Sequence, residues 1–197
     1  MKIIETENLF QSQFVNLNAT KFADRDGDEK FWVWAQRPND QRAVMIVPYI
    51  NFGFKPFSAK PPAGYQKDMR IVLTKEFRVP LNDYEFGFPA GLIGGDEEIV
   101  DAATRELFEE TNLKIEKIIQ VSPFVYNTAG LSDESIAMVF CEASGLPSNK
   151  NSEASEDIKV IIATPDNVHE IISNPANKIA AKAWLILNQF VSQKNVS

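Results

Sequence analysis

The chain has 197 residues, of which 44% are hydrophobic and 24% are charged, so it can bury the core of one domain. Its formal net charge of -7 disfavours nucleic acid and anionic membrane surfaces as partners, because both require basic patches. The single cysteine, Cys141, excludes a disulfide within the chain and a zinc site built from cysteines, and it indicates a core residue in a reducing, cytoplasmic setting. The longest apolar runs are strand-sized, whereas a membrane span needs roughly 20 residues, and the acidic first residues do not resemble a signal peptide.

The first 40 residues predict a pair of strands. Residues 10–22 alternate loosely between apolar and polar side chains, and residues 30–36 have the pattern of the returning strand. Between them, the stretch DRDGDE over residues 24–29 predicts a hairpin turn around Gly27. Because a strand pair is marginally stable alone, we expect the unit over residues 1–40 to pack on another surface, such as a second subunit.

The remainder, residues 41–197, predicts one mixed α/β domain. Apolar segments predict strands over residues 42–49, 69–77, 84–88, 114–126, 135–143 and 157–163. Two polar stretches predict loops, one over residues 55–67 and one over residues 146–156.

Three helices are expected in this part of the chain. A central helix covers residues 97–112, and Thr164 as N-cap with Pro165 at the first helical position predicts a second helix that ends near Ile172. Apolar residues on one stripe predict the last helix over residues 179–191. This order of elements favours a mixed sheet with helices on its faces.

The segment from Gly91 to Leu113 carries seven acidic side chains within 23 residues. Helical spacing places Glu106, Glu109 and Glu110 on nearly one face, where each like-charge pair costs a few tenths of a kcal/mol, roughly. This helix contains no lysine and one arginine to offset the repulsion. A divalent cation such as Mg²⁺ removes it, because Mg²⁺ prefers carboxylate oxygens and suits phosphate substrates. The alternative is a solvated acidic surface.

The same segment resembles the Nudix box. Its pattern is G-x5-E-x7-R-E-U-x-E-E-x-G-U, where x is any residue and U is an aliphatic residue. The matching positions are Gly91, Glu97, Arg105, Glu106, Leu107, Glu109, Glu110 and Leu113. Asn112 stands in place of the second glycine, and at a helix end Asn is the second choice after Gly for a left-handed backbone.

The resemblance implies the Nudix fold, an α/β/α sandwich with a mixed sheet, and hydrolysis of a nucleoside diphosphate by a water activated by Mg²⁺ or Mn²⁺. It implies metal binding by Glu106 and Glu110, while Glu109 binds a second ion or holds a metal-bound water. Arg105 would pair with Glu97 to orient the ligands.

The sequences that flank the box resemble the ADP-ribose pyrophosphatase branch of this family. They are KEFRVP at residues 75–80, EFGFPAGLIGGDE at residues 85–97 and NTAGLSDES at residues 127–135. The branch patterns are Q-[FY]-R-x-P, E-x-PAG-x-I-D-x-GE and SPG-x-S/T-[DE]. Gly94 replaces the aspartate of the second pattern, and residues 128–130 read TAG where the third has SPG. These departures leave open a different nucleoside diphosphate sugar as the substrate.

Carried over by position, this resemblance assigns further residues. Trp32 would stack on the adenine, Arg37 would lie near the phosphates of the nucleotide, and Arg78 would meet the phosphates or the terminal ribose. Glu85 and Gly130 complete the expected substrate-binding set. The alternatives are core or dimer packing for Trp32 and a surface ion pair for Arg78.

Three more positions complete the expected catalytic and metal-binding set. Ala90 would offer its backbone carbonyl to the metal. In the loop over residues 146–156, Glu153 is the candidate catalytic base and Glu156 the candidate metal contact, although both also suit an exposed acidic loop.

The resemblance therefore implies a homodimeric ADP-ribose pyrophosphatase that produces AMP and ribose 5-phosphate, with the N-terminal strands helping to build the neighbour's nucleotide pocket. One alternative keeps the chemistry and changes the substrate to GDP-mannose or another nucleoside diphosphate sugar. Another is a module that senses ADP-ribose without hydrolysing it. The number of metals and the identity of the base among the loop glutamates remain open at this point.

Overall fold

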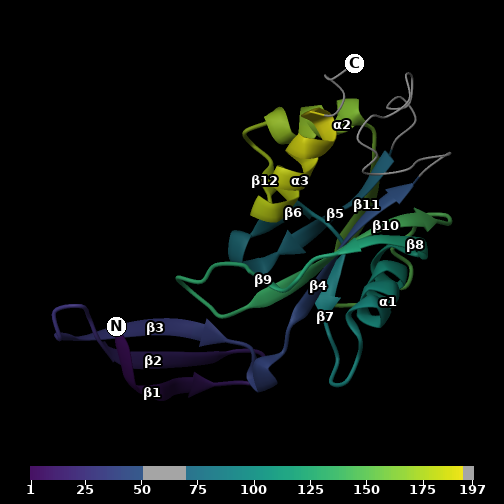
Figure 1. Ribbon diagram of the computed structural model, residues 1–197. Helices are drawn as coiled ribbons and strands as arrows, with labels where there is room; N and C mark the ends of the chain where they lie inside the picture. The colour runs from purple at the N-terminus through teal and green to yellow at the C-terminus, as the bar shows by residue number, and fades with distance from the viewer. Residues whose placement is uncertain (51–69, 193–197) are drawn as a thin grey trace.

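The computed structural model describes residues 1–50 and 70–192, and Figure 1 shows a small N-terminal sheet that stands away from the main body. The loop expected over residues 55–67 lies outside the described residues.

The N-terminal sheet contains three antiparallel strands in the order β1 (Lys2–Gln11), β2 (Asn16–Ala23) and β3 (Glu29–Gln36). The predicted pair corresponds to β2 and β3, and the turn around Gly27 is confirmed, with φ of 91° at that glycine. The prediction missed β1, whose residues are all exposed and therefore lack an alternating pattern of burial. Residues 10–22 are not one strand, because the hydroxyl of Ser12 caps a turn by accepting a hydrogen bond from the Val15 amide at 2.9 Å.

The main sheet is mixed, as the sequence predicted. Among the described residues, strand β4 is parallel to β10, strand β12 is parallel to β6, and the other pairings are antiparallel. Its strands are β4 (Ala43–Ile50), β5 (Arg70–Arg78), β6 (Asp83–Gly87), β7 (Ala90–Leu92), β8 (Lys114–Val121), β9 (Val125–Tyr126), β10 (Ser135–Ser144), β11 (Ile158–Ala163) and β12 (Lys178–Ile179). Short 3-10 turns, η1 (Pro38–Asp40) and η3 (Val79–Leu81), precede β4 and β6.

Three differences from the predicted strands are small. Strands β7 and β12 were not predicted because they contain three and two residues, too few for a periodic pattern. The strand expected over residues 114–126 is interrupted at residues 122–124, where the Ser122 hydroxyl accepts a hydrogen bond from the amide of Met138 at 2.8 Å.

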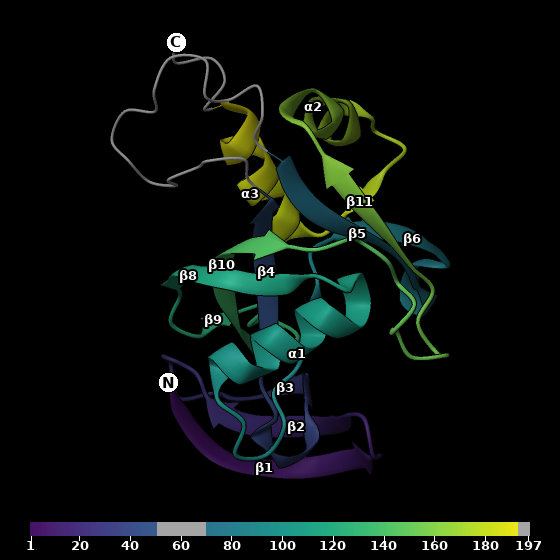
Figure 2. The same ribbon diagram turned by 90° about the vertical axis from the view of Figure 1, so that its right-hand side faces the viewer.

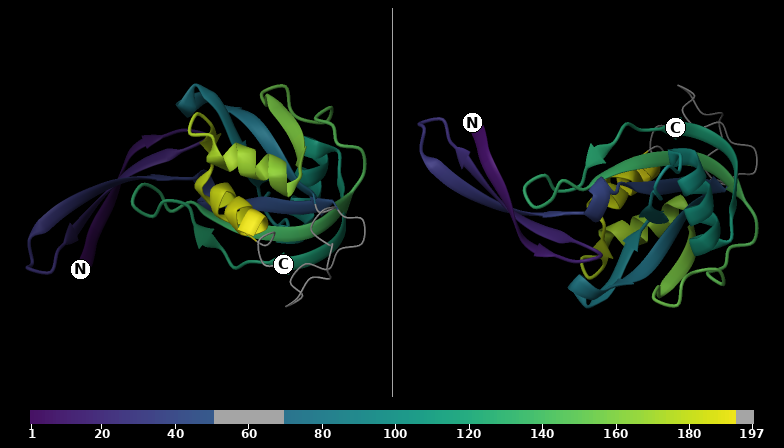
Figure 3. Two further views of the ribbon diagram at one scale, coloured as in Figure 1. Left: turned by 90° about the horizontal axis from the view of Figure 1, so that it is seen from above. Right: turned by 90° about the horizontal axis from the view of Figure 1, so that it is seen from below.

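The three predicted helices are present as α1 (Ile99–Thr111), α2 (Pro165–Ser173) and α3 (Ala181–Ser192). Thr164 forms the N-terminal cap of α2 by accepting the amide of Asn167 at 3.1 Å, and Pro165 is the first helical residue. Asn112 ends α1 with φ of 59°, which confirms the left-handed backbone expected at that position. Figures 2 and 3 show α1 on one face of the main sheet and the α2–α3 pair on the other.

Alternating side chains of β4 explain why both faces are covered. Val44 and Ile46 pack in one core cluster with Leu107 of α1, whereas Met45 and Val47 pack in a second cluster that also contains residues of α2 and α3. A strand that is apolar on both faces needs a layer on each side, and the result is the predicted sandwich.

Cys141 belongs to the core cluster on the α1 side, as expected. It lies on β10, is fully buried, and burial raises the pKa of its thiol to about 12. Within the described residues, no helix has the length and hydropathy to cross a bilayer.

Candidate active site

Helix α1 lies against β7 at Gly91, and this contact places its glutamates. A Cβ atom on Gly91 would stand 1.9 Å from Oε1 of Glu106, so the carboxylate of Glu106 occupies the space that a side chain would fill. Glu106 is 8% exposed, and Glu110, one turn further, is 3% exposed. The first glycine of the box is therefore required by the packing of helix on strand.

Arg105 is the centre of an ion-pair network within the box. Its Nε and Nη2 bind the two oxygens of Glu97 at 3.0 and 2.9 Å, while Nη1 lies 2.7 Å from Glu106 and 3.2 Å from Glu109. Nη2 also donates to the carbonyl of Leu92 at 3.0 Å, which ties the helix to β7. The sequence-based pairing of Arg105 with Glu97 is present in the structure.

The two buried glutamates of α1 have unusual environments. Burial raises the pKa of Glu110 to about 9, against an ordinary value of 4.5, and burial also raises the pKa of Glu106. One oxygen of Glu110, Oε1, accepts a long 3.4 Å hydrogen bond from the amide of Ala90, while Oε2 is buried without any partner. A buried carboxylate oxygen without a donor or a cation is costly, so its position calls for a ligand.

Strands β5 and β6 contribute a second acidic pair. Glu76 and Glu85 are directly opposite in the antiparallel ladder, so both project from the same face of the sheet. Arg78 pairs with both, with Nη1 2.6 Å from Glu76 Oε1 and Nε 3.7 Å from Glu85 Oε2. Burial raises the pKa of Glu76, and the charges of Glu156 and Glu85 act in the same direction. Glu76 was not among the predicted site residues.

The two candidate glutamates of the loop over residues 146–156 differ in their relation to α1. The charge of Glu156 adds to burial in raising the pKa of both Glu106 and Glu110. Glu153 instead contacts its own loop, with its amide donating to Oε2 of Glu156 at 3.1 Å and its carboxylate accepting from Ser155 at 3.4 Å. Among the described residues, no hydrogen bond or ion pair joins Glu153 to the helix.

We call the resulting set of carboxylates the acidic site. Its members are Glu76, Glu85, Glu106, Glu109, Glu110 and Glu156.

The chemistry of the acidic site fits a divalent cation. Carboxylate oxygens are the ligands that Mg²⁺ and Mn²⁺ prefer, and the unpaired oxygen of Glu110 is available to one. Within residues 1–50 and 70–192, however, no three acidic, histidine or cysteine side chains already stand in coordinating positions around one point. Several of these carboxylates are held instead by Arg78 and Arg105. Binding a cation therefore requires some carboxylates to exchange an arginine for the ion.

The predicted nucleotide-binding residues of the N-terminal sheet form a separate group. The indole N–H of Trp32 donates to the carbonyl of Gly130 at 3.1 Å, and Arg37 pairs with Glu134 at 2.9 Å. Burial opposes the ionisation of Glu134, but hydrogen bonds from Asn127 and Arg37 outweigh it and lower the pKa of Glu134. Among the described residues, no hydrogen bond or ion pair connects Trp32, Gly130 or Arg37 with the acidic site of the same chain.

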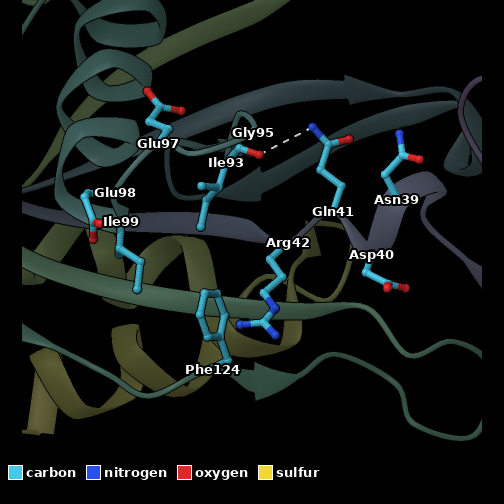
Figure 4. A pocket seen from close by; sticks show the side chains of 10 residues that line it. All are labelled: Asn39, Asp40, Gln41, Arg42, Ile93, Gly95, Glu97, Glu98, Ile99 and Phe124. Carbon is cyan, nitrogen blue, oxygen red and sulfur yellow. Dashed lines mark hydrogen bonds between the residues drawn. The ribbon is translucent and has the colours of Figure 1, made fainter.

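Two hollows share residues 40–42 in their lining. One has a volume of about 580 Å³ and is bordered by Glu97, and the other has about 230 Å³ and is bordered by Arg37. Arg42 borders both, and Figure 4 shows its guanidinium beside the ring of Phe124, whose centroid lies 4.5 Å from Cζ of Arg42.

Sequence reasoning found the box residues because their spacing is local. It missed Glu76, although alternation along β5 places Glu76 and Arg78 on one face and was available as a signal. It also missed Arg42, for which the sequence offered no signal, because its partner Phe124 is distant in the chain.

Comparison with known proteins agrees with the geometry. Residues 64–191, more than half of the chain, match the family model of the NUDIX domain. A crystal structure of an ADP compounds hydrolase superposes with a TM-score of 0.72 at 18% identity, covering 100% of this chain and 96% of that chain. At this identity the likeness establishes the fold.

Several curated proteins are similar in sequence. The chain is 32% identical over 153 residues to the ADP-ribose pyrophosphatase of Saccharomyces cerevisiae, a match that covers 76% of this chain and 63% of the relative. It is 28% identical over 138 residues to the ADP-sugar pyrophosphatase of Mus musculus, covering 66% and 56% respectively. With the ADP compounds hydrolase NudE of Escherichia coli it shares 29% identity over 108 residues, which cover 55% of this chain and 48% of the relative. The matches thus span about half to two thirds of the length of these three relatives.

Proposed function

Because the chain belongs to the Nudix family, we propose that it is a metal-dependent pyrophosphohydrolase that cleaves ADP-ribose to AMP and ribose 5-phosphate. The observation that carries the metal dependence is the buried, unpaired carboxylate oxygen of Glu110 within the acidic site. Nudix proteins generally use divalent metal ions, which agrees with this environment. The choice of ADP-ribose is supported by relatives named ADP-ribose pyrophosphatase and ADP-sugar pyrophosphatase.

We assign the binding of Mg²⁺ or Mn²⁺ to the carboxylates of Glu106, Glu109, Glu110 and Glu156, together with the carbonyl of Ala90. When bound, such an ion neutralises charge on the phosphates and lowers the pKa of a coordinated water.

The surrounding residues have distinct tasks in this proposal. Arg105 holds Glu106 and Glu109 from one side, and Glu97 in turn fixes Arg105 through two hydrogen bonds. Glu109 has a side chain that is 44% exposed, compared with 11% for Glu106, so it is the box carboxylate most accessible to a substrate or a water. Glu153 remains the candidate general base.

The substrate is assigned to residues on both sides of the acidic site. Arg78 would bind a phosphate or the terminal ribose, beside Glu85. Trp32 is 51% exposed, and its indole ring is therefore available for stacking on a base. Arg37, which pairs with Glu134, and Gly130, whose carbonyl accepts the indole N–H of Trp32, are assigned to the same nucleotide-binding group as Trp32.

We further propose that the chain acts as a homodimer. The N-terminal sheet exposes large apolar side chains, including Phe10 at 58%, Phe14 at 67% and Phe31 at 68%. Such a surface is typical of an interface. Packing residues 1–40 of one copy against residues 41–197 of another would bring Trp32 and Arg37 to the acidic site of the partner; within the described part of one chain, no hydrogen bond or ion pair joins them to that site. We also retain a cytoplasmic location, which suits the single buried thiol of Cys141.

The first test is a substrate panel for the purified chain. We would measure kcat/KM for ADP-ribose, GDP-mannose, UDP-glucose, NADH and diadenosine polyphosphates, with Mg²⁺, with Mn²⁺ and with EDTA. ADP-ribose should give the highest value, with AMP as product and no turnover in EDTA. Glu109→Gln should reduce kcat by about 100-fold or more at unchanged Tm, and Glu170→Gln, an exposed carboxylate on α2, serves as the matched control.

The other outcomes separate the rivals. A higher kcat/KM for GDP-mannose or another compound would keep the metal-dependent chemistry and replace ADP-ribose as substrate. Turnover that persists in EDTA would contradict the role of the metal. If no compound is hydrolysed, the hydrolase proposal is wrong, and binding of ADP-ribose measured by calorimetry would then favour a sensing module.

A further inference from the structure

Asn112 has two separate functions at the end of α1. Its backbone takes the left-handed conformation, and its amide closes the helix on the carbonyl of Phe108 at 2.8 Å. Its side chain also reaches out of the helix, with Nδ2 donating to the carbonyl of Leu146 at 2.9 Å and Oδ1 accepting from Nδ2 of Asn151 at 3.1 Å. Glycine, which the box pattern has at this position, supplies the backbone conformation but neither side-chain bond.

The partners of Asn112 belong to one loop, residues 146–156, which we call the acidic loop. Further bonds join this loop to the last turn of α1: the amide of Ser148 donates to the carbonyl of Thr111 at 2.9 Å, and Asn151 donates to the carbonyl of Phe108 at 3.4 Å. The first half of the acidic loop is therefore attached to the helix that carries the box glutamates.

The second half of the acidic loop runs to the strand that borders the acidic site. Asn149 donates to the carbonyl of Ile158 at 2.7 Å, and Ile158 begins β11 directly opposite Glu76 of β5. Glu156 lies two residues before that strand, and its carboxylate accepts from the amide of Glu153 at 3.1 Å. The position of Glu156 thus depends on where the acidic loop is held.

We infer that Asn112 is a positioning residue, whose side-chain amide fastens the acidic loop to the end of α1 and thereby sets the position of Glu156 relative to Glu106 and Glu110. The attachment itself rests on the hydrogen bonds above, whereas its consequence for hydrolysis rests on the proposed function. A chain with glycine at this position would form the same helix end and leave the loop less firmly held.

The attachment is tested by hydrogen exchange on Asn112→Gly, without metal or substrate. Protection of the amides of Ser148 and Ser152 should fall by about tenfold, because two hydrogen bonds are lost from the loop. The matched control is Asn82→Gly, since Asn82 also has a left-handed backbone, with φ of 48°, but ends the 3-10 turn η3 rather than α1. Equal protection of the acidic loop in Asn112→Gly and the unchanged chain would overturn the inference.

A second measurement tests whether Asn112 acts through Glu156. Titration of the chain with Mn²⁺ alone should show about tenfold weaker binding for Asn112→Gly. The double variant Asn112→Gly, Glu156→Gln should bind no more weakly than Glu156→Gln alone. Asn112→Asp, which still accepts from Asn151 but cannot donate to Leu146, should lie between the unchanged chain and Asn112→Gly. Fully additive losses would contradict a role through Glu156.

The readouts separate this inference from the proposed function. If the unchanged chain hydrolyses its substrate, Asn112→Gly should lower kcat about tenfold with little change in KM, because substrate contacts are untouched. A chain that hydrolyses nothing would refute the hydrolase proposal, while the exchange and Mn²⁺ data would still decide whether Asn112 holds the acidic loop.

Discussion

Glu97 and Glu110 belong to one motif, and their surroundings move their pKa values in opposite directions. Hydrogen bonds from Arg105 and from the amide of Gly94 lower the pKa of Glu97 to about 2, so this residue is a permanent anion. Burial raises the pKa of Glu110 to about 9, so at neutral pH it holds a proton unless a cation replaces it. Identical side chains therefore serve different purposes, one as a fixed partner of arginine and the other as a candidate ligand.

The first prediction concerns the pH dependence of stability. The folded chain keeps a proton on Glu110 that the unfolded chain releases near its ordinary pKa of 4.5, so without divalent cations the free energy of unfolding should fall as pH rises from 5 to 9. Above about pH 9 the contribution of Glu110 to this slope ends, because both states are then ionised. Glu110 contributes at most about 1.4 kcal/mol per pH unit to the slope of the free energy of unfolding against pH.

Urea denaturation in EDTA from pH 5 to 9 measures this slope. Glu110→Gln should make it shallower, because the amide does not titrate, whereas the contributions of Glu76 and Glu106 remain in both proteins. Added Mg²⁺ should weaken or reverse the slope in the unchanged chain, because metal binding requires the ionised carboxylate. Equal slopes for the two proteins in EDTA would show that burial does not perturb Glu110 as the structure indicates.

At the scale of elements, the close approach of α1 to β7 decides the geometry of the box. Arg105 fastens the helix to the carbonyl of Leu92, and Gly91 leaves room for the carboxylate of Glu106. The helix ends are set by local sequence, as the caps at Thr164 and Asn112 show. Helix α1 can lie this close to β7 because Gly91 has no side chain.

The second prediction is that Gly91→Ala displaces Glu106. Because its methyl group would overlap the Glu106 carboxylate, we expect a destabilisation of about 1–3 kcal/mol and a loss of Mn²⁺ affinity of about 10- to 100-fold. Gly95→Ala is the matched control, since nothing lies within 4 Å of a Cβ atom at Gly95 and its backbone is not left-handed. Thermal unfolding and Mn²⁺ titration measure the two effects, and similar results for the two variants would argue against the steric role of Gly91.

At the scale of the whole molecule, the N-terminal sheet is the feature that a single chain leaves unexplained. Figures 1 and 3 show it extending from the main body, and its apolar side chains Phe31 and Val33 are 68% and 50% exposed. Strand β3, which carries them, is hydrogen-bonded to the loop between β9 and β10 of the main body: the amide of Ala35 donates to the carbonyl of Leu131 at 2.8 Å. An outstretched apolar sheet of this kind suits exchange of contacts between two copies.

The third prediction is that Phe31→Asp combined with Val33→Asp converts a dimer into monomers. Two charges in an apolar interface remain unpaired, so association should weaken beyond detection at micromolar concentration. Light scattering after size-exclusion chromatography measures the mass, and kcat/KM for ADP-ribose should fall with it by about tenfold or more. Leu185→Asp, at a 63% exposed position on α3, is the control. A monomeric unchanged chain would contradict the proposed dimer.

The sequence by itself determined the features that depend on neighbours in the chain. The spacing of Glu106, Glu109 and Glu110, the cap at Thr164 and the left-handed end at Asn112 all follow from residues within one or two turns. The order of strands and helices along the chain also predicted a mixed sheet with helices on its faces. These features are local or periodic, and so they can be recognised without a structure.

Only the tertiary structure decided what depends on contacts between distant segments. Strand register brings Glu85 opposite Glu76 and within 3.7 Å of Arg78, which no local pattern specifies. The burial of Glu110 depends on the packing of α1 against the sheet, and the side-chain bonds of Asn112 depend on where the acidic loop returns to the helix. Burial and register arise from the packing of whole elements, so the charge state of Glu110 and the role of Asn112 could be assigned only once the fold was known.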